Sequence, residues 1–301
     1  MDRKRENMID YYLAFDVGGT TIKYGLVDKN LNISHTGKVA TEKNKDGHIL
    51  KMLKKVTSQF KNEYHLIGIG VSTAGIVGKN GEIAYAGPTI LDYRGTPIKA
   101  ELEKDFNLHT NVVNDVDAAL LGEKLAGNAK GYTSIYCVAL GTGIGGAYYE
   151  AGKMFSGAHG TANNIGWTLY DVKTKTNFEQ RGSTLSLQAK LAPLGIDPIE
   201  GFKRAKTGSS QEKKIIEEWS LEVAEGLSNI LLLFDPEVLI IGGAVSKQGD
   251  YLKGLLEKQL KKILPPNLCK TKIKMASLGN KAQLYGAIEK FFTNFRKRLH
   301  K

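Results

Sequence analysis

The chain has 301 residues, 42% hydrophobic and 24% charged, which is ordinary for a globular protein and enough for two lobes. No apolar run reaches the length of a membrane span and no apolar signal core follows the charged start, so we expect a cytoplasmic protein without a membrane partner. The net charge is +11, but the lysines are scattered and no recognition helix accompanies them, so we expect a solvated basic surface and no nucleic-acid partner.

The first predicted element is a β-hairpin, with strands over residues 11–16 and 22–28 and a tight glycine loop between them. Asp16, at the end of the first strand, is a candidate ligand for Mg²⁺, directly or through water. The loop and its flank carry the candidate phosphate ligands Gly18, Gly19, Thr20, Thr21 and Lys23. Glycines let backbone N–H groups approach an anion, threonines add hydroxyl donors and lysine adds charge. A plain turn needs neither the acid nor the hydroxyls, so we favour a phosphate loop.

A strand that ends in two polar residues is predicted over residues 111–115. A helix is predicted after it, over residues 118–123. Asp115 is a candidate general base, because an aspartate at a strand end beside a cleft can accept a hydroxyl proton. The alternative is that Asn114 and Asp115 cap the following helix. Spacing alone leaves both interpretations open, since Asp117 could also serve as the cap.

A second strand–loop–strand unit echoes the first, with strands over residues 135–140 and 147–149 around a loop over 141–146. Its candidate phosphate ligands are Gly141, Thr142 and Gly143. The repetition indicates a duplicated architecture with a nucleotide between the halves. The loop also fits G-x-G-x-x-G, but a dinucleotide site requires a helix after this motif, and a strand is predicted there instead.

The C-terminal third of the chain contributes one more candidate ligand site. Apolar residues at helical spacing over residues 219–234 predict a core helix, which Asp235-Pro236 ends. A buried strand is predicted over 238–241, and Gly242 and Gly243 follow it. A glycine pair at the carboxyl end of a strand allows a ligand close to the backbone. A helix is predicted over the basic tail.

These segments together resemble the ROK family of sugar kinases (repressor, open reading frame, kinase). The resemblance rests on residues 16–23, 114–115, 141–146 and 235–243, which occur in the family's order. It implies an α/β fold of the actin-like ATPase (ribonuclease H-like) type, with two lobes and a central cleft. It also implies ATP and Mg²⁺, transfer of the γ-phosphoryl to a sugar hydroxyl, usually the 6-hydroxyl, Asp115 as the catalytic base, and a homodimer.

The resemblance also gives the expected domains and sugar ligands. We expect a smaller lobe of residues 1–118, on which a C-terminal helix over 285–301 packs, and a larger lobe of 119–301. The expected sugar-binding residues are Thr89, Asn114, Asp115, Asn164, Trp167 and Glu179.

The chain departs from the family in the region that binds sugar and zinc. Residues 157–167 align with the family pattern G-x-x-G-x-A-G-E-I-G-H, so Asn164 replaces a glutamate and Trp167 replaces a histidine that usually binds both sugar and zinc. The family's cysteine cluster is absent from residues 172–177, so we expect no zinc. Thr89 stands about where the family has an asparagine.

These departures bear on the substrate. An asparagine can donate as well as accept hydrogen bonds, and a tryptophan face suits a pyranose ring or a second sugar. The alternative is that Trp167 fills the space left by the zinc loop. The zinc-free pattern most resembles β-glucoside kinases, with glucokinase and N-acetylmannosamine kinase as alternatives. A sugar-sensing transcriptional regulator of the family is disfavoured, because too few residues precede the first strand for a helix-turn-helix.

Overall fold

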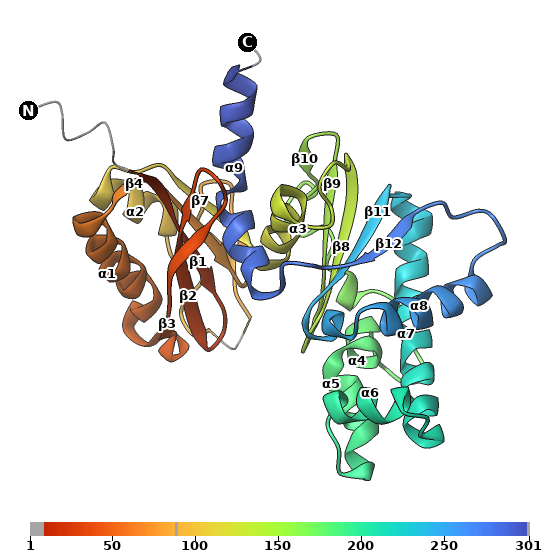
Figure 1. Ribbon diagram of the computed structural model, residues 1–301. Coiled ribbons are helices and arrows are strands. Elements are labelled where there is room, and N and C mark those ends of the chain that lie inside the picture. Colours follow the sequence, from red (N-terminus) through yellow and green to blue (C-terminus); the bar gives the residue numbers. More distant parts are fainter. Residues whose placement is uncertain (1–8, 88–89, 300–301) are drawn as a thin grey trace, which may run out of the picture. The chain divides into compact units, whose positions relative to one another are not determined.

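The computed structural model describes residues 9–87 and 90–299 and divides into two compact units (Figure 1). The first unit is formed by the chain up to Gly127 and from Asn280 onward, and the second unit is Asn128–Gly279. The sequence predicts a boundary after residue 118 instead. That position lies inside helix α3 (Asp115–Ala126), which continues unbroken to Ala126, so the units divide where this helix ends.

A five-stranded sheet in the order β3-β2-β1-β4-β7 forms the centre of the first unit. Its strands are β1 (Asp10–Val17), β2 (Thr21–Asp28), β3 (Ile33–Ala40), β4 (His65–Thr73) and β7 (Thr110–Asn114), and a small separate sheet pairs β5 (Ile76–Val77) with β6 (Ile83–Tyr85). The other helices are α1 (His48–Glu63), α2 (Ile98–Phe106) and α9 (Ala282–Leu299). The predicted hairpin is confirmed, since β1 and β2 pair antiparallel, whereas β1, β4 and β7 run parallel.

Side chains alternate between the two faces of β1, and this alternation places Asp16. Leu13 and Phe15 belong to the buried cluster that includes the apolar faces of α1 and α2. Tyr12 lies on the opposite face and stacks on Phe291 of α9, with 4.9 Å between the ring centroids. Asp16 is four residues after Tyr12, so its side chain lies on the same face of β1, the face that α9 covers. Helix α3 packs against α9 (Figure 1).

The second unit has a five-stranded sheet in the order β10-β9-β8-β11-β12. Its strands are β8 (Ser134–Leu140), β9 (Ile144–Glu150), β10 (Lys153–Met154), β11 (Val238–Gly242) and β12 (Lys272–Met275). Its helices are α4 (Phe178–Gly182), α5 (Thr184–Leu191), α6 (Pro198–Lys206), α7 (Ser210–Phe234) and α8 (Asp250–Ile263), with 3-10 turns η2 (Ile165–Trp167), η3 (Ala192–Leu194) and η4 (Ala244–Gln248).

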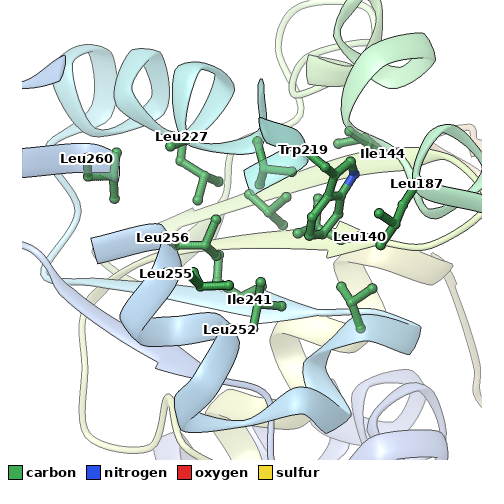
Figure 2. Packing of buried hydrophobic residues seen from close by; sticks show 14 of the residues in the cluster. Leu140, Ile144, Leu187, Trp219, Leu227, Ile241, Leu252, Leu255, Leu256 and Leu260 are labelled. Carbon is green, nitrogen blue, oxygen red and sulfur yellow. The ribbon is translucent and has the colours of Figure 1, made fainter. Parts of the chain in front are cut away.

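The core of the second unit lies between its sheet and helices α5, α7 and α8 (Figure 2). Leu140 and Ile241 come from neighbouring strands, and Leu227 and Leu256 face them from the helices. Trp219 of α7 is fully buried, and its indole N–H donates to the carbonyl of Gly182 at 3.0 Å, so burial leaves no polar atom unpaired. The predicted core helix is confirmed as part of α7.

The two sheets have equivalent strand orders. In each, a central strand (β1 or β8) pairs antiparallel with the next strand in sequence on one side and parallel with a later strand on the other. This equivalence confirms the duplicated architecture and the α/β class predicted from the sequence. Within the described ranges, none of the helices has the length and apolar character needed to cross a membrane.

Candidate active site

Asp16, at the end of β1, is one of the buried acids of the first unit. Its carboxylate is held by register neighbours on both sides: Lys23 of β2 places Nζ 3.5 Å from Oδ2, and the hydroxyl of Ser72 on β4 donates to Oδ1 at 3.4 Å. Burial raises the pKa of Asp16, and the positive charge and hydrogen bond of Lys23 oppose that rise. Because burial dominates, the ionised carboxylate would gain from a further cation, which fits the magnesium ligand predicted here.

Asn114 forms the N-cap of α3, which answers the question left open by its spacing. Its Oδ1 accepts hydrogen bonds from the backbone N–H groups of Val116 (2.9 Å) and Asp117 (3.3 Å), and its Nδ2 donates to the carbonyl of Gly75 at 2.8 Å. The Asn114 side chain is thus engaged in holding the strand–helix junction. Asp115 is consequently the first residue of the helix rather than its cap.

Two carboxylates at the start of α3 have strongly perturbed acidity. Burial, and secondly the negative charge of Asp16, raise the pKa of Asp115 to about 6. Burial, and secondly the charge of Asp115, raise the pKa of Asp117 to about 6. A carboxylate with a pKa near neutrality is well suited to accept a proton, because general bases work best with a pKa close to the working pH.

The first glycine loop is closed by a hydrogen bond from the N–H of Gly18 to the carbonyl of Thr21, at 2.9 Å. Thr41, just after β3, fastens the loop from outside: its hydroxyl donates to the carbonyl of Gly19 at 2.9 Å and its N–H donates to that of Thr20 at 3.0 Å. Thr41 is 1% exposed. Sequence analysis missed this residue, because a threonine after a strand carries no local signal of a contact across 22 positions.

The second glycine loop is shorter than predicted. Strand β9 begins at Ile144, so the loop is only Gly141–Gly143, closed by a hydrogen bond from the N–H of Gly141 to the carbonyl of Gly143 at 2.9 Å. The prediction of a loop over 141–146 is wrong because Gly145 and Gly146 pair with β8 as strand residues. The carbonyl of Gly141 accepts hydrogen bonds from Thr184, a residue that sequence analysis also missed.

Glu179 of α4 lies directly beside this loop. Its Oε2 accepts a hydrogen bond of 2.7 Å from the N–H of Ile144. A Cβ on Gly143 would stand 2.6 Å from the same oxygen, so a side chain there would displace the carboxylate. The resemblance assigns Glu179 to the sugar, and the contact shows that one of its oxygens is committed to the loop.

The glycine pair at the carboxyl end of β11, Gly242 and Gly243, lies beside the start of the second loop. Gly243 has a φ of +85°, and a Cβ there would stand 2.2 Å from the carbonyl oxygen of Leu140, the last residue of β8. Only glycine satisfies both constraints. The pair predicted to lie near a ligand thus lies next to the strand end from which the loop departs.

The remaining sugar candidates of the second unit lie at its surface. Trp167, at the end of η2, is 74% exposed, so it does not fill an internal space, and its aromatic face is available for contact. Asn164 is exposed, and its Nδ2 donates to the carbonyl of Thr161 at 2.7 Å, which leaves its carbonyl oxygen free of that contact. Thr89 lies outside the described residues.

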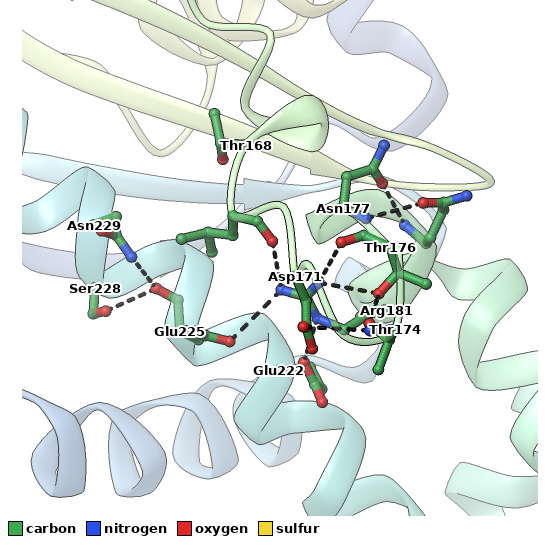
Figure 3. A network of polar contacts seen from close by, with 12 residues as sticks. Thr168, Asp171, Thr174, Thr176, Asn177, Arg181, Glu222, Glu225, Ser228 and Asn229 are labelled. Carbon is green, nitrogen blue, oxygen red and sulfur yellow. Dashed lines mark hydrogen bonds and ion pairs between the residues drawn. The ribbon is translucent and has the colours of Figure 1, made fainter.

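Arg181 organises the segment in which the family's cysteine cluster is missing (Figure 3). Its guanidinium donates to the carbonyls of Thr176 (2.9 Å) and Leu169 (2.9 Å) and to the carboxylate of Glu222 on α7 (3.0 Å). Five donors in a planar fork suit such a junction. Among the described residues, His, Cys, Asp and Glu nowhere gather in threes that could hold a metal ion.

The fold places the chain among known proteins. The crystal structure of a ROK family glucokinase from Streptomyces griseus, in complex with glucose and AMPPNP, matches it with a TM-score of 0.77 and 26% sequence identity over 92% of this chain and 97% of that one. The architecture is therefore that of the actin-like ATPases. The ROK family model matches residues 12–291, and the chain belongs to the ROK family.

Two relatives in sequence cover nearly the whole chain. An uncharacterized protein of Clostridium perfringens is 35% identical over 292 residues, spanning 95% of this chain and 99% of the relative. A beta-glucoside kinase of Listeria monocytogenes is 26% identical over 289 residues, spanning 92% of this chain and 96% of that enzyme.

Proposed function

We propose that this protein is an ATP-dependent sugar kinase that phosphorylates the 6-hydroxyl of a hexose or β-glucoside, with Asp115 as the general base. The observation that carries the proposal is the placement of Asp115, half-buried at the start of α3, where desolvation and the charge of Asp16 raise its pKa to about 6. Membership of the ROK family and the similarity to the glucokinase and beta-glucoside kinase support it.

The chemistry assigned to Asp115 is removal of one proton. As the sugar oxygen attacks the γ-phosphorus, the hydroxyl proton passes to the Asp115 carboxylate, and the bond from phosphorus to the bridging oxygen breaks to leave ADP. At neutral pH a base with a pKa of about 6 is largely ionised and still more basic than an ordinary aspartate, so it favours proton transfer.

The two glycine loops supply donors for phosphate oxygens, in the same way in each unit. The backbone N–H groups that do not close the loops, with the hydroxyls of Thr20, Thr21 and Thr142, would bind the anion, and Lys23 would add positive charge. Asp16 would hold Mg²⁺ through water, and the bound ion would neutralise phosphate charge. Gly242 and Gly243 would leave space for the nucleotide near the backbone.

The exposed Trp167 favours a β-glucoside over a free hexose. The residue is 74% exposed, so its indole ring can stack on a second sugar ring, which a monosaccharide does not offer. Thr89, Asn114, Asn164 and Glu179 complete the proposed sugar ligands. Glucose and N-acetylmannosamine are the alternative substrates, and we expect the active protein to be a homodimer.

An ADP-release assay over glucose, cellobiose, gentiobiose, N-acetylmannosamine and fructose tests the proposal. We expect sugar-dependent ADP release, larger with cellobiose or gentiobiose than with glucose. Preference for glucose or N-acetylmannosamine would reject the β-glucoside but keep the kinase. ADP release that is the same without sugar would reject the sugar kinase altogether. Light scattering of the active fraction tests the dimer.

A further inference from the structure

Both glycine loops are fastened in the same manner by a threonine that lies outside the loop. In the first unit the hydroxyl of Thr41 donates to the carbonyl of Gly19 at 2.9 Å. In the second unit the hydroxyl of Thr184 donates to the carbonyl of Gly141 at 2.6 Å. Thr184 is the first residue of α5, so its backbone N–H has no partner within the helix, and this N–H donates to the same oxygen at 2.9 Å.

The carbonyl that is held belongs to a Gly-Thr peptide in each loop: Gly19-Thr20 and Gly141-Thr142. A trans peptide is planar, and its C=O and N–H point in opposite directions. Fixing the carbonyl on the outer threonine therefore aims the N–H of Thr20, or of Thr142, away from that threonine. The orientation of one amide in each loop is thus set by a hydroxyl outside it.

The amides aimed in this way have no protein partner among the described residues. Within the part of the chain that the structure describes, the N–H groups of Thr20 and Thr142 donate to no acceptor. A backbone N–H without a protein partner is satisfied by water or by a ligand, and adjacent glycines allow an anion to approach closely. Two amides that are free and held in orientation suit oxygens of phosphate groups.

We propose that Thr41 and Thr184 are positioning residues that orient the N–H groups of Thr20 and Thr142 toward the phosphate oxygens of the nucleotide. The inference rests on the proposed ATP-binding role of the loops and adds two residues to it. Neither threonine touches the nucleotide. Each acts through the peptide whose carbonyl it binds, so its loss should weaken nucleotide binding and leave sugar binding unchanged.

The experiment compares Thr41→Val and Thr184→Val, which keep the side-chain shape but lose the hydroxyl, with Thr41→Ser and Thr184→Ser, which keep it. Binding of AMPPNP with Mg²⁺ is measured by titration calorimetry, and KM is measured for ATP and for the sugar. We expect each valine variant to weaken AMPPNP binding and raise the KM for ATP about three- to tenfold, the value of one net hydrogen bond. The KM for sugar should change less than about twofold, and each serine variant should restore the parent values.

Matched controls remove a threonine hydroxyl bound to a carbonyl elsewhere. Thr57→Val loses a buried hydrogen bond to Leu53 within α1, and Thr271→Val loses one to Pro236, before the first residue of β11 and thus at the opposite end of that strand from Gly242. Both should bind AMPPNP like the parent. If Thr41→Val does not fold, the serine variants and Thr184→Val still test the proposal, because Thr184 is only half-buried.

The outcomes separate this inference from the proposed function. Valine variants that bind AMPPNP like the parent, or that weaken ATP and sugar equally, would overturn the role of the threonines. If the parent binds AMPPNP but phosphorylates no sugar, the proposed sugar-kinase function is wrong. The AMPPNP affinities of the valine variants, measured by calorimetry, then still decide whether the two threonines position the loops. A parent that binds no nucleotide would overturn both.

Discussion

The carboxylate of Glu179 accepts a 2.7 Å hydrogen bond from the backbone N–H of Ile144, the residue that follows the second glycine loop. A residue assigned to the sugar thus directly supports a loop assigned to phosphate, within one unit. Removing this side chain should therefore disturb both substrates. We expect Glu179→Ala to raise the KM for ATP and for sugar at least about tenfold each, since hydrogen bonds to charged groups are the stronger ones.

Glu179→Gln separates the two roles. Glutamine keeps an oxygen that can accept from Ile144 but loses the charge, so the KM for ATP should stay close to the parent value while the KM for sugar rises. Steady-state kinetics with each substrate varied in turn make the comparison. An alanine variant with an unchanged KM for ATP would show that the contact does not support the loop.

Asp115→Asn should lower kcat by about 10²- to 10⁴-fold, because asparagine keeps the shape but cannot take a proton. Binding of AMPPNP should persist, since the change removes a base and no phosphate ligand. The control is Asp105→Asn, which breaks an ion pair with Lys54 on the surface of the same unit. A variant that turns over sugar as fast as the parent would show that Asp115 is not the base.

The pH profile should report the raised pKa of Asp115. The base works only when ionised, so kcat/KM should be level above pH 7 and fall about tenfold per pH unit below the pKa of about 6. The charge of Asp16 contributes to that pKa, so Asp16→Asn should move the acid limb of its residual activity to lower pH. A limb that stays in place would exclude this coupling.

Asp117 offers a test through stability. Its pKa is raised to about 6 in the folded protein, so its contribution to stability is greatest below the unfolded pKa, near 4, and is lost as pH rises through about 6. Asp117→Asn should therefore raise the free energy of unfolding at pH 8 by up to about 3 kcal/mol and give no gain at pH 4. Urea unfolding at the two pH values measures both. An equal gain at both would point to packing rather than charge.

Local sequence patterns predicted what depends on neighbours in sequence. The hairpin around Gly18 and Gly19 follows from the tight glycine loop between two short strands, and α7 follows from apolar spacing. The predicted boundary after residue 118 differs from the division of the two units after Gly127, because α3 runs on from Asp115 to Ala126 and no local pattern marked its end. The second loop was predicted to be too long because glycines usually indicate a loop, whereas Gly145 and Gly146 pair with β8 as residues of a strand.

Residues that act across the fold left no such signal. Thr41 and Thr184 are ordinary threonines in sequence, and only the backbone path brings them to loop carbonyls. The raised pKa of Asp115 depends on burial and on Asp16, about a hundred positions earlier, so no local motif reports it. The resemblance to the ROK family supplied the assignment of Asp115 that spacing left undecided.

The segment around Arg181 yields the last prediction. Arg181 is largely buried and binds the carbonyls of Leu169 and Thr176 as well as Glu222 (Figure 3). Arg181→Leu would leave these acceptors without their donor, and we expect it to lower the free energy of unfolding by about 2–3 kcal/mol. Lys203→Gln, which breaks an exposed ion pair with Glu200, should cost less than about 1 kcal/mol.

The same junction predicts that no metal holds this segment. Because the junction is made by the guanidinium of Arg181, incubation of the parent protein with EDTA should leave its Tm unchanged, and metal analysis should find no stoichiometric zinc. A Tm that falls with EDTA and recovers with zinc would show that a metal, and not Arg181 alone, holds the segment.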